Sequence, residues 1–131
     1  MKTHQYELID EKVFEHEFDN GLKLFIIPKP GFQKTYVTYT TQFGSLDNHF
    51  KPIGSQQFVK VPDGVAHFLE HKLFEKEDED LFTAFAEENA QANAFTSFDR
   101  TSYLFSATSN IESNIKRLLN MVETPYFTEE T

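Results

Sequence analysis

The spacing of apolar residues along the chain predicts a mixed succession of strands and helices. Alternating apolar and polar residues, and runs rich in β-branched and aromatic residues, are typical of strands, whereas apolar residues three and four apart are typical of helices. The order is three strands, two helices, two strands and a last helix. The strands are expected at residues 12–19, 22–27, 33–43, 91–97 and 102–108, and the helices at 63–74, 80–88 and from 109 or 110 to just before 125.

Turn-forming residues support these boundaries. Asn20-Gly21 lies between the first two strands and is a strong signal for a β-hairpin. Residues 1–11 are expected to be a loose arm or an edge strand, and residues 46–62 a protruding hairpin or loop. The charged residues 75–80 are expected to be a solvated connection. Helices grouped beside a largely antiparallel sheet predict an α+β fold, a two-layer sandwich with the helices packed on one face.

Composition narrows the function classes. The chain has 131 residues, which suits one domain or part of one, and its net charge of −9 argues against a nucleic-acid partner. It has no cysteine, so a disulfide framework and thiol chemistry are excluded, and the chain suits a reducing compartment. Residues 1–10 are polar and do not resemble a secretion signal, and no apolar run is long enough to span a membrane. A cytoplasmic protein without a membrane partner is therefore expected.

The helix predicted at residues 63–74 carries the pattern H-x-x-E-H, formed by His67, Glu70 and His71. At about 100° per residue, these three side chains fall within an arc of roughly 100° on one helix face. The opposite face is apolar and consists of Val65, Leu69 and Leu73. Asp63 is the expected N-cap of this helix. The motif therefore predicts a polar face of defined chemistry on an otherwise apolar helix.

Two imidazoles four residues apart can bind one zinc ion, and a neighbouring carboxylate can take a proton from the water that zinc activates. H-x-x-E-H is the signature of the inverzincins, which use this arrangement for hydrolysis. The alternative is a surface helix that carries two histidines and a glutamate by accident. The apolar flanks favour the metal site, because they predict a partly buried setting in which polar groups need partners.

The stretch G-V-A-H-F-L-E-H-K-L-F closely resembles the active-site helix of the pitrilysin (insulinase) family of zinc peptidases. Residues 43–47 and 93–103 resemble two further segments of that family, in the same order and spacing, and the likeness looks closest to cytoplasmic zinc proteases of Gram-positive bacteria. The resemblance implies a processing-peptidase-like fold, a Zn²⁺ cofactor held by His67 and His71, and Glu70 as catalytic base. It also implies that Asn93, Ala94, Phe95 and Thr96 form a strand that binds an extended peptide substrate, with the small Ala94 allowing close approach.

One departure from the family concerns the third zinc ligand, which in the family is a glutamate on a later helix. Glu129 and Glu130 follow Pro125 too closely to match it. Residues 1–131 are therefore expected to be a single partial domain, the N-terminal part of a peptidase, without activity alone. The alternative is a non-catalytic peptide-binding or structural subunit of the same family. Some paired members of the family are inactive, and truncation is expected to expose apolar surface, so a homo- or hetero-oligomer with a family partner is expected.

Overall fold

The structure is a computed structural model that describes residues 1–129. It contains two compact units, Met1–Gln33 and a second unit that begins at Lys34, and each is described by itself. None of the helices in the described residues is long and apolar enough to cross a bilayer. The single domain expected over residues 1–131 stays a prediction.

The first unit is a three-stranded antiparallel sheet with the order β1-β2-β3. Its strands are β1 (Lys2–Tyr6), β2 (Glu11–Glu17) and β3 (Lys23–Ile26), with a 3₁₀ turn at Glu7–Ile9 between the first two. Gly21 has φ of +86°, and the Phe18 N–H donates to the Leu22 carbonyl at 2.9 Å. β2 pairs with β3, so the hairpin predicted from Asn20-Gly21 is confirmed. Glycine suits this turn because it accepts the positive φ without strain. The edge strand expected within residues 1–11 is β1.

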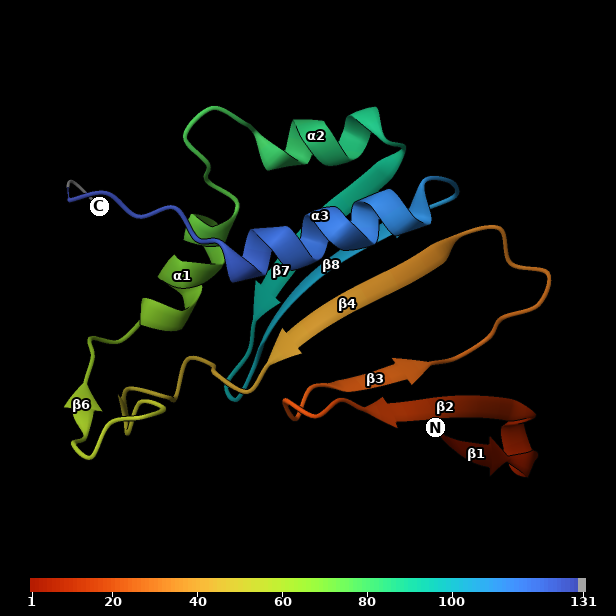
Figure 1. Cartoon of the computed structure of the whole chain (residues 1–131), viewed down its shortest axis with the longest axis horizontal. Coiled ribbons are helices and arrows are strands. Elements are labelled where there is room, and N and C mark those ends of the chain that lie inside the picture. The colour runs from red at the N-terminus through yellow and green to blue at the C-terminus, as the bar shows by residue number, and fades with distance from the viewer. Residues whose placement is uncertain (130–131) are drawn as a thin grey trace. The chain divides into compact units, whose positions relative to one another are not determined.

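The second unit contains the main sheet, formed by β4 (Thr35–Thr41), β7 (Ala90–Thr96) and β8 (Thr101–Ala107). All pairs are antiparallel, and β8 is the central strand (Figure 1). Tyr39, Tyr103 and Ala94 lie side by side across the three strands. Residues 46–62 form the expected hairpin, with two short strands, β5 (His49–Phe50) and β6 (Val59–Lys60).

Three helices pack against one face of the main sheet: α1 (Val65–Leu73), α2 (Leu81–Glu87) and α3 (Ile111–Glu123) (Figure 1). Between helices and sheet lies an apolar core, in which the Phe85 and Phe105 rings stack 5.8 Å apart. Its other large buried side chains are Phe74, Leu81, Tyr103, Leu118 and Met121. Alternation along β8 produces this layer, since Tyr103, Phe105 and Ala107 all face the helices. The predicted α+β fold with helices on one sheet face is confirmed.

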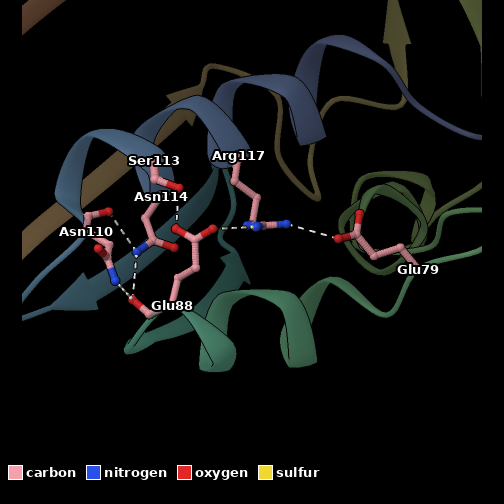
Figure 2. Close-up of polar contacts among 6 residues, drawn as sticks. All are labelled: Glu79, Glu88, Asn110, Ser113, Asn114 and Arg117. Carbon is pink, nitrogen blue, oxygen red and sulfur yellow. Dashed lines mark hydrogen bonds and ion pairs between the residues drawn. The ribbon is translucent and has the colours of Figure 1, made fainter.

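A polar cluster joins α3 to the end of α2 (Figure 2), and we call it the Glu88 cluster. It consists of Glu79, Glu88, Asn110, Ser113, Asn114 and Arg117. Arg117 donates to Glu79 and to Glu88, each at 3.0 Å, and the Ser113 hydroxyl donates to Glu88. The Ser113 hydrogen bond, followed by the Arg117 guanidinium, lowers the pKa of Glu88. The fully buried Asn114 amide donates to the carbonyls of Glu88 and Asn110 at 3.2 and 3.0 Å.

The charged segment at residues 75–80 is largely exposed, as predicted for a solvated connection, and it is also attached to α3. The Lys76 ammonium donates to the carbonyl of Thr124 at the end of α3, and Glu79 pairs with Arg117. A cation at this end of a helix meets free carbonyls and the negative end of the helix dipole. The sequence could not show this, because the partners lie 38 and 48 residues away.

Candidate functional site

The N-cap of helix α1 is Gly64, which has φ of +88°, and no side chain caps the helix. The prediction that Asp63 caps this helix is wrong. The Asp63 carboxylate accepts a hydrogen bond from the Asn48 amide at 3.0 Å and so fastens the hairpin of residues 46–62 to the helix entry. The left-handed backbone at Gly64 starts the helix instead, and glycine adopts that conformation at little cost.

The apolar face of α1 is seated on the sheet, as predicted, although Val65, Leu69 and Leu73 are only partly buried. Leu69 and Leu73 line a hollow of about 480 Å³, which also has Tyr39, Tyr103 and Phe127 in its wall. The fully buried residues of the helix are Ala66 and Lys72. Lys72 is 3% exposed and pairs with Glu75, one turn further on. Sequence reasoning gave Lys72 no role, although the i, i+3 spacing to Glu75 is a usable signal for the pair.

His67, Glu70 and His71 converge on one side of α1. Their ligand atoms lie within 4.8 Å of one another, and the Nε2 atoms of the two histidines are 3.1 Å apart. Both imidazoles are exposed, whereas Glu70 is partly buried. Partial burial was expected for all three residues of the motif, but only Glu70 is partly buried. Helix geometry accounts for the convergence, since residues three and four apart are neighbours on the helix surface.

The spacing of the two imidazoles suits a shared zinc ion. Zn–N bonds of about 2.0–2.1 Å in tetrahedral geometry place two ligand nitrogens roughly 3.3 Å apart, close to the observed 3.1 Å. Because both imidazoles are exposed, a metal ion held by them would stay open to water, as a catalytic site requires. Within residues 1–129, no further histidine, cysteine or carboxylate joins this group. Glu129 is not part of it, and Glu130 lies outside the described residues.

The Glu70 carboxylate is held from the sheet. The Thr96 hydroxyl, at the end of β7, donates to Glu70 Oε2 at 2.5 Å. Tyr103 lies on the same side of the sheet and is 4% exposed. Burial, together with the negative charge of Glu70, raises the pKa of Tyr103 to about 12. The carboxylate thus has a hydroxyl donor and a neutral phenol as its neighbours on the sheet.

The four residues predicted to bind substrate lie together on β7, which is an edge strand of the main sheet. Ala94 and Thr96 are on the helix side and partly buried, whereas Asn93 and Phe95 are exposed on the other side. The Asn93 side-chain oxygen accepts a hydrogen bond from the Ala94 N–H at 2.8 Å. β7 and α1 are in contact, so the edge strand runs beside the motif helix.

The turn between β7 and β8 packs closely against the backbone of Gly44. A Cβ atom at residue 44 would lie 2.5 Å from the Phe98 carbonyl oxygen and from the Arg100 nitrogen. The Ser45 N–H donates to the Ser97 carbonyl at 2.9 Å, and the Thr101 hydroxyl donates to the Phe43 carbonyl at 2.7 Å. Sequence reasoning assigned no such role to Gly44, although a glycine at the end of a strand is a signal of close backbone approach.

Comparisons with known proteins agree with this geometry. The family model described as Insulinase (Peptidase family M16) matches residues 52–131. The uncharacterised zinc protease YmfH of Bacillus subtilis (strain 168) is 53% identical over 131 residues, which is all of this chain and 31% of that protein. Human insulin-degrading enzyme is 30% identical over 123 residues, covering 86% of this chain and 11% of that enzyme.

Among solved structures, an M16-like peptidase from Alicyclobacillus acidocaldarius matches with a TM-score of 0.84 and 38% identity. The match covers 92% of this chain and 28% of that one. The chain thus spans less than a third of the length of each of these relatives. The matched family model covers more than half of the chain, including the whole H-x-x-E-H motif. The chain belongs to the insulinase family of peptidases, peptidase family M16.

Proposed function

We propose that this chain supplies part of the active site of a zinc-dependent endopeptidase. The observation that carries the proposal is the convergence of His67, Glu70 and His71 within 4.8 Å, with the two imidazole nitrogens at a spacing that suits one metal ion. In this proposal His67 and His71 hold Zn²⁺, and Glu70 is the general base. Relatives named as zinc proteases support the same assignment.

Bound zinc supplies Lewis acidity, which activates a water and polarises a peptide carbonyl. Glu70 accepts the proton of the attacking water and returns it to the leaving amine, so that one carboxylate serves both proton transfers. Its place one helical turn from His67 and next to His71 keeps it within reach of a water at the metal. Its partial burial excludes bulk water from one side of the carboxylate.

The substrate proposed for this site is an extended peptide that adds to the edge of β7. Among Asn93, Ala94, Phe95 and Thr96, the residues whose main-chain groups point away from β8 would hydrogen-bond the peptide and give affinity with little demand on sequence. The contact between β7 and α1 supports this proposal, because a peptide on this edge would lie beside the motif. A homo- or hetero-oligomer with a family partner and a cytoplasmic location are proposed from the resemblance alone.

The test uses the intact protein and a library of fluorogenic peptides. Hydrolysis should disappear after complete removal of metal by a chelator and return when Zn²⁺ is added. Activity that survives full metal removal would overturn the proposal. An exposed edge strand can also bind peptide without cleaving it, which is the non-catalytic alternative. Peptide binding by fluorescence anisotropy, with no hydrolysis in the zinc-loaded protein, would favour that alternative.

A further inference from the structure

We infer that Thr96 is the positioning residue of Glu70: its hydroxyl fixes one carboxylate oxygen and leaves the other free for the proton transfer. This inference rests on the proposed function and adds to it. It gives the Thr96 side chain a task within the chain itself, distinct from the main-chain contact with substrate predicted for the same residue.

The hydrogen bond between the two side chains is short and selective. Thr96 Oγ1 lies 2.5 Å from Glu70 Oε2, a length typical of a hydroxyl that donates to a charged carboxylate. Among the described residues, Thr96 is the only hydrogen-bond donor to the Glu70 side chain, and Oε1 accepts no bond from them. No lysine or arginine of residues 1–129 forms an ion pair with Glu70. The two oxygens of the carboxylate are therefore different, one bound and one available.

A glutamate on a helix surface needs such an anchor if it is to act as a base. Its side chain has three rotatable bonds, and the last torsion is broad rather than confined to one well. Proton transfer requires the accepting oxygen within hydrogen-bond reach of the water. A fixed donor on a neighbouring element selects one orientation before substrate arrives, which is how a supporting residue contributes to catalysis through another group.

Thr96 is itself held rigidly. As a β-branched residue it has restricted χ1, and as the last residue of β7 it pairs with Thr101 on the central strand. Thr101 is 2% exposed and donates to the Phe43 carbonyl, while the turn that follows Thr96 is packed on Gly44. The donor thus belongs to the sheet and the acceptor to α1. The hydrogen bond therefore holds the carboxylate of the proposed base at a fixed place relative to the sheet.

The experiment compares Thr96→Val, Thr96→Ser and the matched control Thr40→Val in the intact zinc-loaded protein. Valine keeps the shape and the β-branch but removes the hydroxyl. It should lower kcat by about 10- to 100-fold, the range expected when a reacting group is misplaced by about 1 Å, while KM and bound zinc stay the same. Serine keeps the hydroxyl and should restore kcat to within about threefold. Thr40 is on the same sheet and bonds the Ser102 hydroxyl at 2.7 Å, so its replacement should leave kcat unchanged.

A second measurement does not depend on turnover. Crystal structures of the intact wild-type protein and of Thr96→Val should show an ordered Glu70 carboxylate in the first and a moved or multiply oriented one in the second. A Glu70 carboxylate that keeps its place without the hydroxyl would overturn the inference, whether or not the protein is a peptidase. Equal kcat for wild type and Thr96→Val would also overturn it. A wild-type protein that shows no peptidase activity, but has the hydroxyl-dependent orientation, would instead sink the proposed function alone.

Discussion

The two ends of the β7–β8 hairpin carry polar clusters of opposite character. At the end where β7 begins and β8 ends, the Glu88 cluster pairs its charges within the chain: Arg117 lies between two carboxylates and Ser113 donates to one of them (Figure 2). At the turn end, Glu70 receives one hydroxyl and no cation from the described residues, and His67 and His71 face each other at 3.1 Å.

The difference separates a polar cluster that supports the fold from one that is proposed to bind a metal ion. Charges that lie partly buried are costly unless they are paired and hydrogen-bonded. In the Glu88 cluster Arg117 pairs with both carboxylates and ties α3 to α2, although the buried Arg117 Nε and Asn114 Oδ1 have no hydrogen-bond partner among the described residues. The second cluster, which we call the motif cluster, consists of His67, Glu70 and His71, and a divalent cation would complete it in the proposed function. Variants at the two ends should therefore fail in different ways.

The largest effect is expected for Glu70→Gln in the intact protein. Glutamine cannot accept the proton, so kcat should fall by about 10²- to 10⁴-fold, while the zinc content stays at the wild-type level. His67→Ala should lose the zinc itself. Peptide hydrolysis and metal analysis of the same preparations check both variants. Zinc loss in Glu70→Gln that matches the loss in His67→Ala would make Glu70 a ligand, against the assignment.

The next largest effect is expected for Gly44→Ala. This change disturbs the turn that follows Thr96, the residue that donates to Glu70. The added Cβ would lie 2.5 Å from backbone atoms of Phe98 and Arg100, so the turn must shift. Such overpacking costs about 1–3 kcal/mol of unfolding free energy, and kcat should fall as well because Thr96 precedes this turn. Denaturant unfolding and kinetics of the variant check this, with Ser45→Ala as the control. A variant as stable as wild type would show that the turn is not packed as described.

Arg117→Met should disturb the Glu88 cluster and leave the motif cluster intact. Methionine keeps the contact with Phe85, over whose ring the guanidinium carbon lies at 5.8 Å, but leaves Glu79 and Glu88 without their cation. Both carboxylates are exposed enough for solvent to screen the two pairs, so the free energy of unfolding should fall only modestly, with kcat per folded molecule unchanged. The control is Lys116→Met, which removes an exposed pair with Glu112. Equal stability of the two variants would contradict a structural role for the Glu88 cluster.

The smallest effect concerns Tyr103 and appears only in alkali. Its folded-state pKa of about 12 is above the ordinary value of 10.0. Between these values the unfolded chain loses the phenolic proton while the folded chain keeps it, so stability is complete below pH 10 and falls as pH rises towards 12. At pH 11 the loss is about 1 kcal/mol. Unfolding of wild type and Tyr103→Phe at pH 9 and pH 11 should show a smaller decline in the variant. Equal declines would mean that Tyr103 is not buried beside Glu70.

Local patterns in the sequence predicted the elements well, because each element depends on residues near one another. Asn20-Gly21 predicts the first hairpin, and the 3.6-residue period of Ile111, Ile115 and Leu118 predicts α3. The motif face on α1 follows from helix geometry in the same way. The cap of α1 was predicted wrongly. Asp63 has the residue type of a cap, but its carboxylate accepts a hydrogen bond from Asn48, 15 residues earlier.

What the sequence could not predict are contacts that depend on packing between distant segments. The pairing of Lys76 with the end of α3 joins residues 48 apart, and the bond from Thr96 to Glu70 joins residues 26 apart. The resemblance to the pitrilysin family placed Thr96 in a substrate strand, and that role stays a prediction. No pattern indicated that its hydroxyl turns to the base, because β-strand alternation gives the side of a residue but not its partner.

The interval between Glu70 and Thr96 also fixes an order of events during synthesis. Translation at about 5–20 residues per second separates the appearance of two residues that are 26 apart by about 1–5 s. Helix α1 contains only local hydrogen bonds, whereas β7 must wait for β8 before it belongs to a sheet. In the proposed function, the two metal ligands and the base are therefore synthesised before the hydroxyl that orients the base.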